Sequence, residues 1–406
     1  MKHARSLVFL LPPALITLGM YGSAPAASAA CATQFMSVPI PPQADAHFLT
    51  GVAAVGASAW AVGPDATSFG SVVIHWNGSA WVNKALPVTS QQRATLRGVG
   101  GSSNIDVWAV GDTYGRSGFL SARGEILDPS DVRTSLRSTT SATDRALALH
   151  WDGSSWTKLN APMPARARGG VLFGMDSVSP TDAWAVGLAW RHPRRGRTLI
   201  EHWNGVSLTR VPSPNVGTHA SDLFGVTAIS TNDVWAVGRW GRLNGAGHAL
   251  VEHWDGSTWS TVPVGLRNTI LTSVSGSSAS DVWVVGGPYY HAAHRRPVAL
   301  HWDGVSWTSE PLPSLPPNTV LFGVTAPSAG DAYAVGAGFD AATGTEAASV
   351  LRWNGSDWTR QTSEAGQDGE FLGVAAGTSG VWAVGSTTPD PIDPYDVTGL
   401  IETPCQ

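Results

Sequence analysis

The chain has 406 residues and a formal net charge of −5 at neutral pH, from 25 lysines and arginines against 30 aspartates and glutamates. A mildly acidic balance argues against nucleic acid as the main partner, because binding to phosphates needs a basic surface. The length alone would suggest two or three domains, but an internal repeat, described below, replaces that estimate.

Residues 1–30 predict a cleaved signal peptide. Lys2, His3 and Arg5 form a short basic segment, residues 7–21 are mostly apolar, and Ala27-Ser28-Ala29 has the small residues that signal peptidase prefers. No other apolar run approaches the ~20 residues needed to cross a bilayer, so we expect a secreted protein with no membrane attachment after cleavage. A lipid anchor on Cys31 is the alternative, but Ser28 replaces the branched apolar residue usual in lipoprotein signals.

Two short patterns then alternate along residues 31–406. The first ends in D-x-W-A-V-G and the second is H-W-[DN]-G-x-x-W, and most spacings within each series are 48 to 52 residues. One spacing of about 75 marks an insertion at about 112–145 in the second repeat. The first pattern occurs seven times and the second six times, so the seventh repeat is incomplete. The repeated aromatic positions are Trp60, Trp108, Trp184, Trp235, Trp283, Tyr333 and Trp382 in the first pattern, and Trp76, Trp151, Trp203, Trp254, Trp302 and Trp353 in the second.

Each repeat predicts four short strands. In the fourth repeat these are residues 223–228, 233–238, 249–254 and 259–262, with Asp255-Gly256 as a tight turn between the last two. Apolar residues alternate with polar or small ones, as half-buried strands require. Four strands repeated seven times predict an all-β, seven-bladed β-propeller as a single domain over residues 31–406.

These motifs resemble the kelch repeat, the type of propeller found in the central domain of galactose oxidase. The resemblance covers nearly the whole mature chain, although only the fifth repeat has the Gly-Gly doublet of kelch, at Gly286-Gly287. Kelch-like propellers include binding modules and a copper oxidase, so the resemblance implies the fold much more strongly than the function.

The incomplete seventh repeat predicts how the ring closes. Residues 400–405 align with a third strand, and residues 31–39 align with the missing fourth strand. We therefore expect the N-terminal strand to complete the C-terminal blade. Cys31 and Cys405 fall where other blades have the Asp-Gly turn, and the exported context favours a disulfide between them.

The repeated tryptophans and histidines are interpreted as scaffold, because every blade has them. Blades with an aspartate at the start of the second strand also have the histidine of the third strand, and blade six pairs Asp331 with Arg352 instead. This co-occurrence predicts a buried Asp–His hydrogen bond within each blade, and no metal site. The pairs are Asp106 with His150, Asp182 with His202, Asp233 with His253 and Asp281 with His301.

The loops that join strands two and three, and those that join successive blades, lie at one end of the ring, here called the variable-loop face. They contain most of the length variation, which is typical of binding loops on a rigid scaffold. Aromatic residues and arginines in blades two to five predict a ligand-binding arc there, suited to a carbohydrate, an anionic small molecule or a protein surface. The same aromatic residues would, in the alternative, extend the packing between blades. The predicted arc comprises Tyr114, Trp190, Arg194, Arg195, Arg197, Trp240, Arg242, Tyr289, Tyr290, His291, Arg295 and Arg296.

The sequence contains no convincing catalytic set. The innermost-strand position held by Ala53, Gly100, Asp176, Thr227, Ser275, Thr325 and Ala375 contains a single charge, and radical copper chemistry would need a free cysteine. We therefore expect a secreted, monomeric, non-catalytic binding propeller without a cofactor. The alternative is a hydrolase, lyase or cyclase that uses Asp176, His291 or His294 on the variable-loop face or at the channel mouth.

Overall fold

The computed structural model describes residues 34–41, 48–65, 70–88, 94–113, 145–191, 196–241, 247–288, 296–340, 345–366, 369–387 and 397–405. These residues form 28 β-strands and no helix, so the prediction of an all-β fold is confirmed. None of them forms a segment with the helical structure and hydropathy needed to cross a membrane. The predicted signal peptide, and the insertion apart from residues 112, 113 and 145, lie outside the described residues.

The strands form five four-stranded sheets and one eight-stranded sheet that contains two blades. Blade one is β2 (Gly51–Val55), β3 (Ser58–Asp65), β4 (Gly70–Trp76) and β5 (Trp81–Asn83). Blade two is β6 (Ala94–Ser103), β7 (Asp106–Thr113), β8 (Arg145–Trp151) and β9 (Trp156–Leu159). Blade three is β10 (Gly169–Ser179), β11 (Asp182–Trp190), β12 (Gly196–Trp203) and β13 (Leu208–Val211). Blade four is β14 (Ala220–Ser230), β15 (Asp233–Gly241), β16 (Gly247–Trp254) and β17 (Trp259–Thr261).

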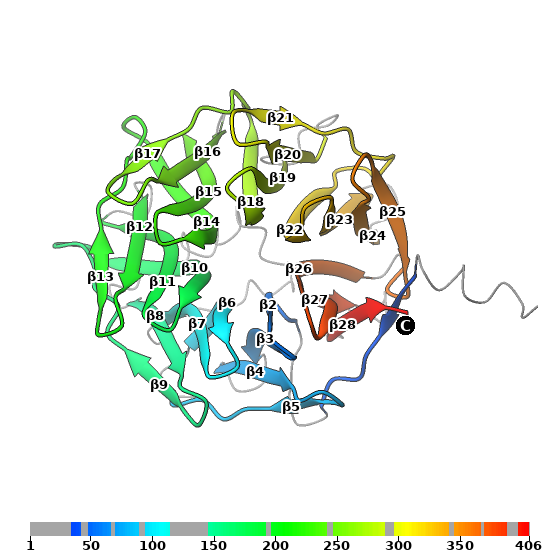
Figure 1. Ribbon diagram of the computed structural model, residues 1–406, viewed down its shortest axis with the longest axis horizontal. Helices are drawn as coiled ribbons and strands as arrows, with labels where there is room; N and C mark the ends of the chain where they lie inside the picture. The colour runs from blue at the N-terminus through cyan, green and yellow to red at the C-terminus, as the bar shows by residue number, and fades with distance from the viewer. Residues whose placement is uncertain are drawn as a thin grey trace, which may run out of the picture.

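The remaining blades follow the same order. Blade five is β18 (Thr269–Ser278), β19 (Asp281–Pro288), β20 (Val298–Trp302) and β21 (Trp307–Ser309). Blade six is β22 (Val320–Ser328), β23 (Asp331–Asp340), β24 (Thr345–Trp353) and β25 (Trp358–Ser363). Blade seven is β26 (Gly369–Gly377), β27 (Gly380–Thr387), β28 (Thr398–Pro404) and the N-terminal strand β1 (Gln34–Ser37). The blades surround a central axis, with the first strand of each blade innermost (Figure 1).

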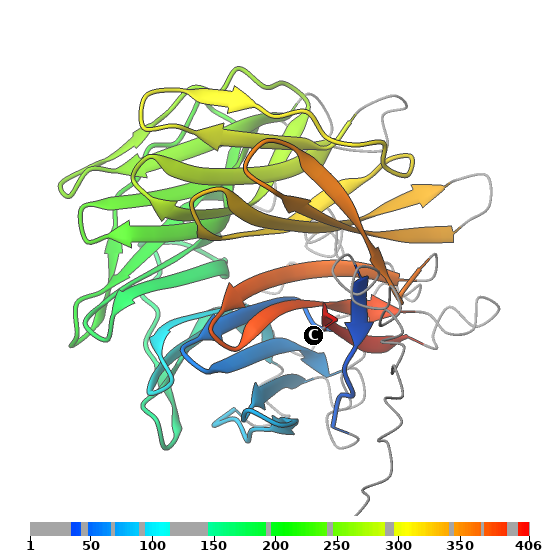
Figure 2. The same ribbon diagram turned by 45° about the vertical axis from the view of Figure 1, so that its right-hand side comes forward.

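The N-terminal strand closes the ring as the sequence predicts. β1 pairs antiparallel with β28, where Phe35 lies opposite Pro404 and Ser37 lies opposite Glu402 (Figure 2). β1 also pairs in parallel with β25, with Gln34 opposite Thr362, and this second pairing joins blades six and seven into one sheet. The sequence analysis did not predict the parallel pairing.

Cys405, the residue that follows β28, lies beside this seam. The backbone N–H of Cys405 donates to the carbonyl of Gln34 over 2.9 Å, and Cys405 does not have a free thiol. Cys31 lies outside the described residues, so its pairing with Cys405 stays a prediction.

The Asp-Gly turns between third and fourth strands have a common local cause. In blade four, Asp255 Oδ1 accepts hydrogen bonds from the backbone N–H groups of Ser257 and Thr258, each over 2.8 Å. Gly256 then adopts a φ of 92°, which favours glycine because a β-carbon would be strained there. At the end of the ring occupied by these turns, here called the turn face, the loops therefore have little freedom to vary.

Tryptophans fill the space between neighbouring blades. Trp184 of blade three lies 5.2 Å from Trp254 and 5.5 Å from Trp259 of blade four, measured between ring centroids. Its other contact is His202 in its own blade, stacked at 4.2 Å. The interpretation of the repeated tryptophans as packing between sheets is confirmed, since Trp60, Trp108, Trp184 and Trp283 are among the largest fully buried side chains.

Candidate functional site

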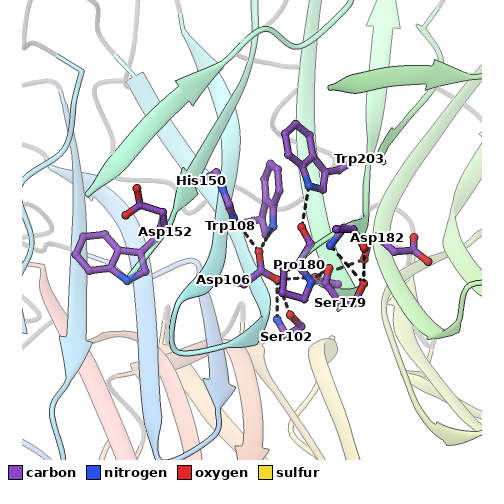
Figure 3. Close-up of polar contacts among 12 residues, drawn as sticks. Ser102, Asp106, Trp108, His150, Asp152, Ser179, Pro180, Asp182 and Trp203 are labelled. Atoms are coloured by element: carbon purple, nitrogen blue, oxygen red, sulfur yellow. Dashed lines mark hydrogen bonds and ion pairs between the residues drawn. The ribbon is translucent and has the colours of Figure 1, made fainter. Parts of the chain in front are cut away.

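The repeated Asp–His pair is a structural hydrogen bond inside blades two to five, as predicted. In blade two, His150 donates from Nε2 to Asp106 Oδ1 over 2.8 Å, and Trp108 donates from Nε1 to the same oxygen over 3.1 Å (Figure 3). Ser102 and, from blade three, Ser177 donate to the other oxygen. Burial acts to raise the pKa of Asp106, but the hydrogen bonds from His150, Ser102 and Ser177 outweigh it and lower the pKa.

The other blades repeat the pair with small changes. The Nε2 atoms of His202, His253 and His301 each lie 2.8 Å from their aspartates, and Arg352 Nε lies 3.0 Å from Asp331. Blade one has no aspartate at this position; its His75 stacks on Trp60 at 4.2 Å, and burial together with Lys84 lowers its pKa to about 4. Among the described residues, no group of three His, Cys, Asp or Glu side chains is placed to hold a metal ion.

The innermost strands place the predicted channel position opposite the repeated aromatic residue. Asp176 pairs with Trp184, Thr227 with Trp235, and Ser275 with Trp283. The strand register thus gives these residues equivalent positions in their blades, and Asp176 is the charged member of that set.

The carboxylate of Asp176 joins two blades. Its Oδ2 accepts the backbone N–H of Ala228 in blade four over 2.8 Å, and its Oδ1 accepts the N–H of Ser177 over 2.8 Å. Burial raises the pKa of Asp176, and hydrogen bonds from Ala228, Ser177 and Thr227 act in the opposite direction. The residue as a whole is half-buried, whereas its carboxylate lies against blade four and is surrounded by protein atoms.

Ser275 makes the same connection between blades five and six, since its Oγ accepts the N–H of Ala326 over 3.0 Å. An equivalent bond from an uncharged residue indicates that the position serves to join blades. The oxygens of Asp176 are therefore already occupied, and the geometry gives no support to its use as a catalytic acid or base. His291 and His294, the other members of the catalytic alternative, lie outside the described residues.

The position of Trp190 differs from the one predicted for it in the binding arc. Its side chain is 5 % exposed and packs with Val171 and Leu188, and a β-carbon on Gly169 would come within 2.3 Å of its ring. β11 continues to this residue, so the indole belongs to the packed sheet rather than to a loop. The prediction that Trp190 presents a free aromatic surface to a ligand is wrong.

Trp240, at the equivalent place in blade four, is half-buried. Its ring stacks on His248 with centroids 4.3 Å apart and an angle of 15°, so His248 covers one face of the indole. A β-carbon on Gly217, in the linker before blade four, would lie 3.8 Å from the same ring. Trp240, in β15, therefore packs between His248 of β16 and the linker before blade four, and only part of its ring remains accessible.

Two exposed arginines lie beside this aromatic stack. Arg197 donates from Nη1 to the carbonyl of Gly217 over 3.5 Å, and Arg267 lies in the linker that pairs with His248. Arg191, Arg197, Arg267 and Arg296 all have exposed side chains. Arg267 was missed in the sequence analysis because that search covered the loops after the second strands and not the linker after blade four.

The loops and linkers that contain these arginines have no carboxylates of their own. Residues 187–200, 212–221, 237–250, 263–269 and 286–298 contain no aspartate or glutamate. Arg239, the buried arginine of this region, pairs through Nε with Asp222 Oδ2 over 3.0 Å and is excluded from the surface. The remaining members of the predicted arc, Tyr114, Arg194, Arg195, Arg242, Tyr289, Tyr290, His291 and Arg295, lie outside the described residues.

Comparison with known proteins identifies the architecture. No family model and no curated protein matches the chain. Among solved structures, it is similar to YCF48 from Cyanidioschyzon merolae, with 12 % identity, a TM-score of 0.51, and coverage of 91 % of this chain and 98 % of that one. An ulvan lyase of polysaccharide lyase family PL25, bound to -[GlcA(1-4)Rha3S]-, has 9 % identity, a TM-score of 0.51, and coverage of 90 % and 94 %.

A GH74 xyloglucanase from Xanthomonas campestris has 12 % identity and a TM-score of 0.51, with coverage of 90 % of this chain and 55 % of that one. At these identities the similarity concerns the fold alone. The neighbours include a protein solved with a bound peptide as well as polysaccharide-degrading enzymes. The chain is a multi-bladed β-propeller of four-stranded sheets.

Proposed function

We propose that the chain is a secreted, non-catalytic binding propeller that recognises an anionic ligand through the variable-loop face of blades three to five. The observation that carries the proposal is a surface of exposed arginines without any carboxylate in the surrounding loops. Guanidinium groups bind carboxylate, sulfate and phosphate groups in planar, paired geometry, and an unneutralised cluster raises the local concentration of anions.

The position of the arginines relative to the aromatic stack supports binding rather than general solubility. Arg197 donates to the carbonyl of Gly217, which lies next to Trp240, and Arg267 pairs with His248, which stacks on Trp240. Both arginines are therefore connected to this stack. Ordered arginines lose less entropy on binding than arginines on free loops. We infer that Trp240 and His248 position the cationic surface, a role that differs from the direct stacking predicted from the sequence.

Three finer predictions stay proposals. The kelch-like repeat, secretion after cleavage of residues 1–30, and the Cys31–Cys405 disulfide are consistent with one another, because an exported chain can form the disulfide that closes its ring. The proposal also includes a monomer, which is supported by closure of the ring within one chain, where the N-terminal strand fills the last blade.

The proposal is tested with two polymers that differ in charge. Polygalacturonate supplies regularly spaced carboxylates on flat sugar rings, and dextran of similar length has no charge. We expect the protein to bind polygalacturonate and not dextran, with an affinity that falls as salt is added. Removing Arg191, Arg197 and Arg267 together should weaken binding by more than tenfold, at roughly 1 kcal/mol for each charge-assisted contact.

Arg210→Ala is the matched control, because Arg210 is an exposed arginine of blade three on the outer strand β13. It should change the affinity by less than about twofold, within the small contribution of an uninvolved surface charge. Equal binding by the triple variant would exclude this surface. Shortening of polygalacturonate during the measurement would instead indicate the enzymatic alternative.

A further inference from the structure

Three blades have a buried glutamate where the others have an aliphatic residue. Immediately before the repeated histidine position, the third strands have Glu201, Glu252 and Glu402, and each of these is 0 % exposed. The equivalent residues of the other blades are Ile74, Leu149, Leu300 and Leu351. Four blades therefore show that the fold needs only an apolar side chain at this position.

Glu402 lies in the seam that closes the ring. It is opposite Ser37 of β1 and Ala383 of β27, and its Oε1 accepts the N–H of Ala365, in the linker after β25, over 2.8 Å. Oε2 has no hydrogen-bond partner among the described residues. Beside it, Glu364 accepts the N–H of Ser37 over 2.8 Å, so a second carboxylate holds the same strand.

Glu201 and Glu252 lie in the middle of blades three and four. Glu201 is opposite Ala185 and Arg210, and neither of its oxygens forms a hydrogen bond with another described residue. Glu252 is opposite Ala236 and Thr261, and Ser213 of the linker before blade four approaches its carboxyl group. Ser213 is four residues before Gly217, which contacts Trp240 of the proposed binding surface.

Burial in these interfaces disfavours the ionised form of all three side chains. It raises the pKa of Glu201 and of Glu252 to about 8, with Ser213 acting weakly in the opposite direction at Glu252. Burial also raises the pKa of Glu402 to about 7; hydrogen bonds from Ser363 and Ala365 oppose the shift and Glu364 adds to it. No cation is among the causes of any of these shifts.

The charged and titratable groups around each glutamate are few. Glu402 faces Glu364 from the linker, while Tyr333, Arg352 and Asp331 of blade six form their own cluster and Arg360 is exposed on β25. Arg210 on β13 lies opposite Glu201 and is exposed, and the nearest cations along the chain in the adjoining blade and linker, Lys158 on β9 and Arg168 before β10, are exposed as well. Around Glu252 are His253 with its partner Asp233, and the half-buried His248.

We propose that these glutamates make closure of the propeller ring pH-dependent. Under acidic conditions β1 stays paired with β25 and β28, and these pairings weaken as the pH rises above neutral. An ionised Glu402 in a seam with a second carboxylate favours separation of β1 from β28, because water can then solvate the charge. Glu201 and Glu252 weaken the adjoining interfaces in the same direction. The inference concerns the scaffold and goes beyond the proposed binding function.

The direction of the effect follows from the two states. Below pH 4.5, the ordinary value for glutamate, the carboxyl groups are neutral in the folded and the unfolded chain and cost nothing. Between pH 4.5 and about 8 these carboxyl groups ionise in the unfolded chain before they ionise in the folded chain, so the free energy of unfolding decreases as the pH rises. Above pH about 8 the free energy of unfolding does not decrease further from this cause.

The test uses the full secreted chain and hydrogen exchange measured by mass spectrometry at pH 5 to 9, corrected for intrinsic exchange. We expect peptides from β1 and β28 to lose at least fivefold protection between pH 6 and pH 9, while β20 of blade five, which has Leu300, keeps its protection. Glu402→Gln, which keeps the shape without the ionisation, should abolish the change at the seam. Glu310→Gln is the control, because it removes a carboxylate that follows the outer strand β21 of blade five. It should leave the loss of protection in β1 and β28 unchanged.

Thermal denaturation separates this role from simple packing. The melting temperature of Glu402→Gln relative to the original chain should rise by at least ~5 °C between pH 4.5 and pH 9, whereas a packing effect gives the same difference at every pH. If Glu402→Gln does not fold, Glu402→Leu, which copies blade five, supplies the same comparison. A pH-independent difference, or equal loss of protection in blades five and seven, would overturn the proposal.

Discussion

Removal of Asp106 should destabilise the propeller much more than removal of Asp233, although the two residues occupy the same repeat position. Asp106 is 1 % exposed at its side chain and accepts hydrogen bonds from His150, Trp108, Ser102 and, across the blade boundary, Ser177. Asp233 is 18 % exposed at its side chain, and His253 is its described side-chain partner. At about 1 kcal/mol net for each buried hydrogen bond, Asp106→Ala should cost about 3–5 kcal/mol and Asp233→Ala about 1–2 kcal/mol.

The assay is reversible urea denaturation followed by tryptophan fluorescence, since Trp108 stacks on His150 and reports directly on the pair. The double variant Asp106→Ala with His150→Ala should cost less than the sum of the single changes. Because hydrogen bonds lower the pKa of Asp106 in the folded chain, its stabilising effect is present above pH about 3.8 and is lost as the pH falls further. Equal losses for Asp106 and Asp233, or strict additivity with His150, would refute the interpretation of this aspartate as a hydrogen-bond hub.

Three further predictions follow from single residues. Trp190→Ala should lower the free energy of unfolding by about 3–5 kcal/mol in urea denaturation, as expected for a buried tryptophan. A decrease below about 1 kcal/mol would indicate that Trp190 is exposed at the surface. Asp176→Ser, which copies Ser275 of blade five, should fold with a melting temperature within ~3 °C of the original because the inter-blade hydrogen bond to Ala228 is kept; a loss of turnover on any polysaccharide in this variant would instead support catalysis. Mass spectrometry of the purified protein should find Cys31 linked to Cys405, and two free thiols or a lipid on Cys31 would contradict the closure by a disulfide.

The sequence predicted the scaffold well because the scaffold is repeated. A histidine that appears with an aspartate in four blades, and an arginine that replaces it in the sixth, indicate a direct contact without any structure. The strand register at Asp176, Thr227 and Ser275 followed from the same alignment of repeats. Ring closure by β1 followed from the incomplete last repeat.

The site was predicted less well because its residues occur once. The position of Trp190 three residues beyond a strand motif did not reveal that β11 continues to it, since strand length depends on pairing with β10 and β12. The parallel contact of β1 with β25 depends on how blades six and seven lie side by side, and a pattern within one blade has no information on that. The buried glutamates were not identified either, because a single charged residue inside an apolar strand pattern does not show whether its side chain reaches water.

The central claim, that an anionic ligand binds to the variable-loop face of blades three to five, is tested most directly by hydrogen exchange with and without polygalacturonate. Binding should increase protection in residues 187–200, 212–221, 237–250 and 263–269, and it should leave the turn-face segments around Asp152, Asp255 and Asp303 unchanged. Protection confined to the turn face, or no change anywhere at saturating polygalacturonate, would contradict the claim.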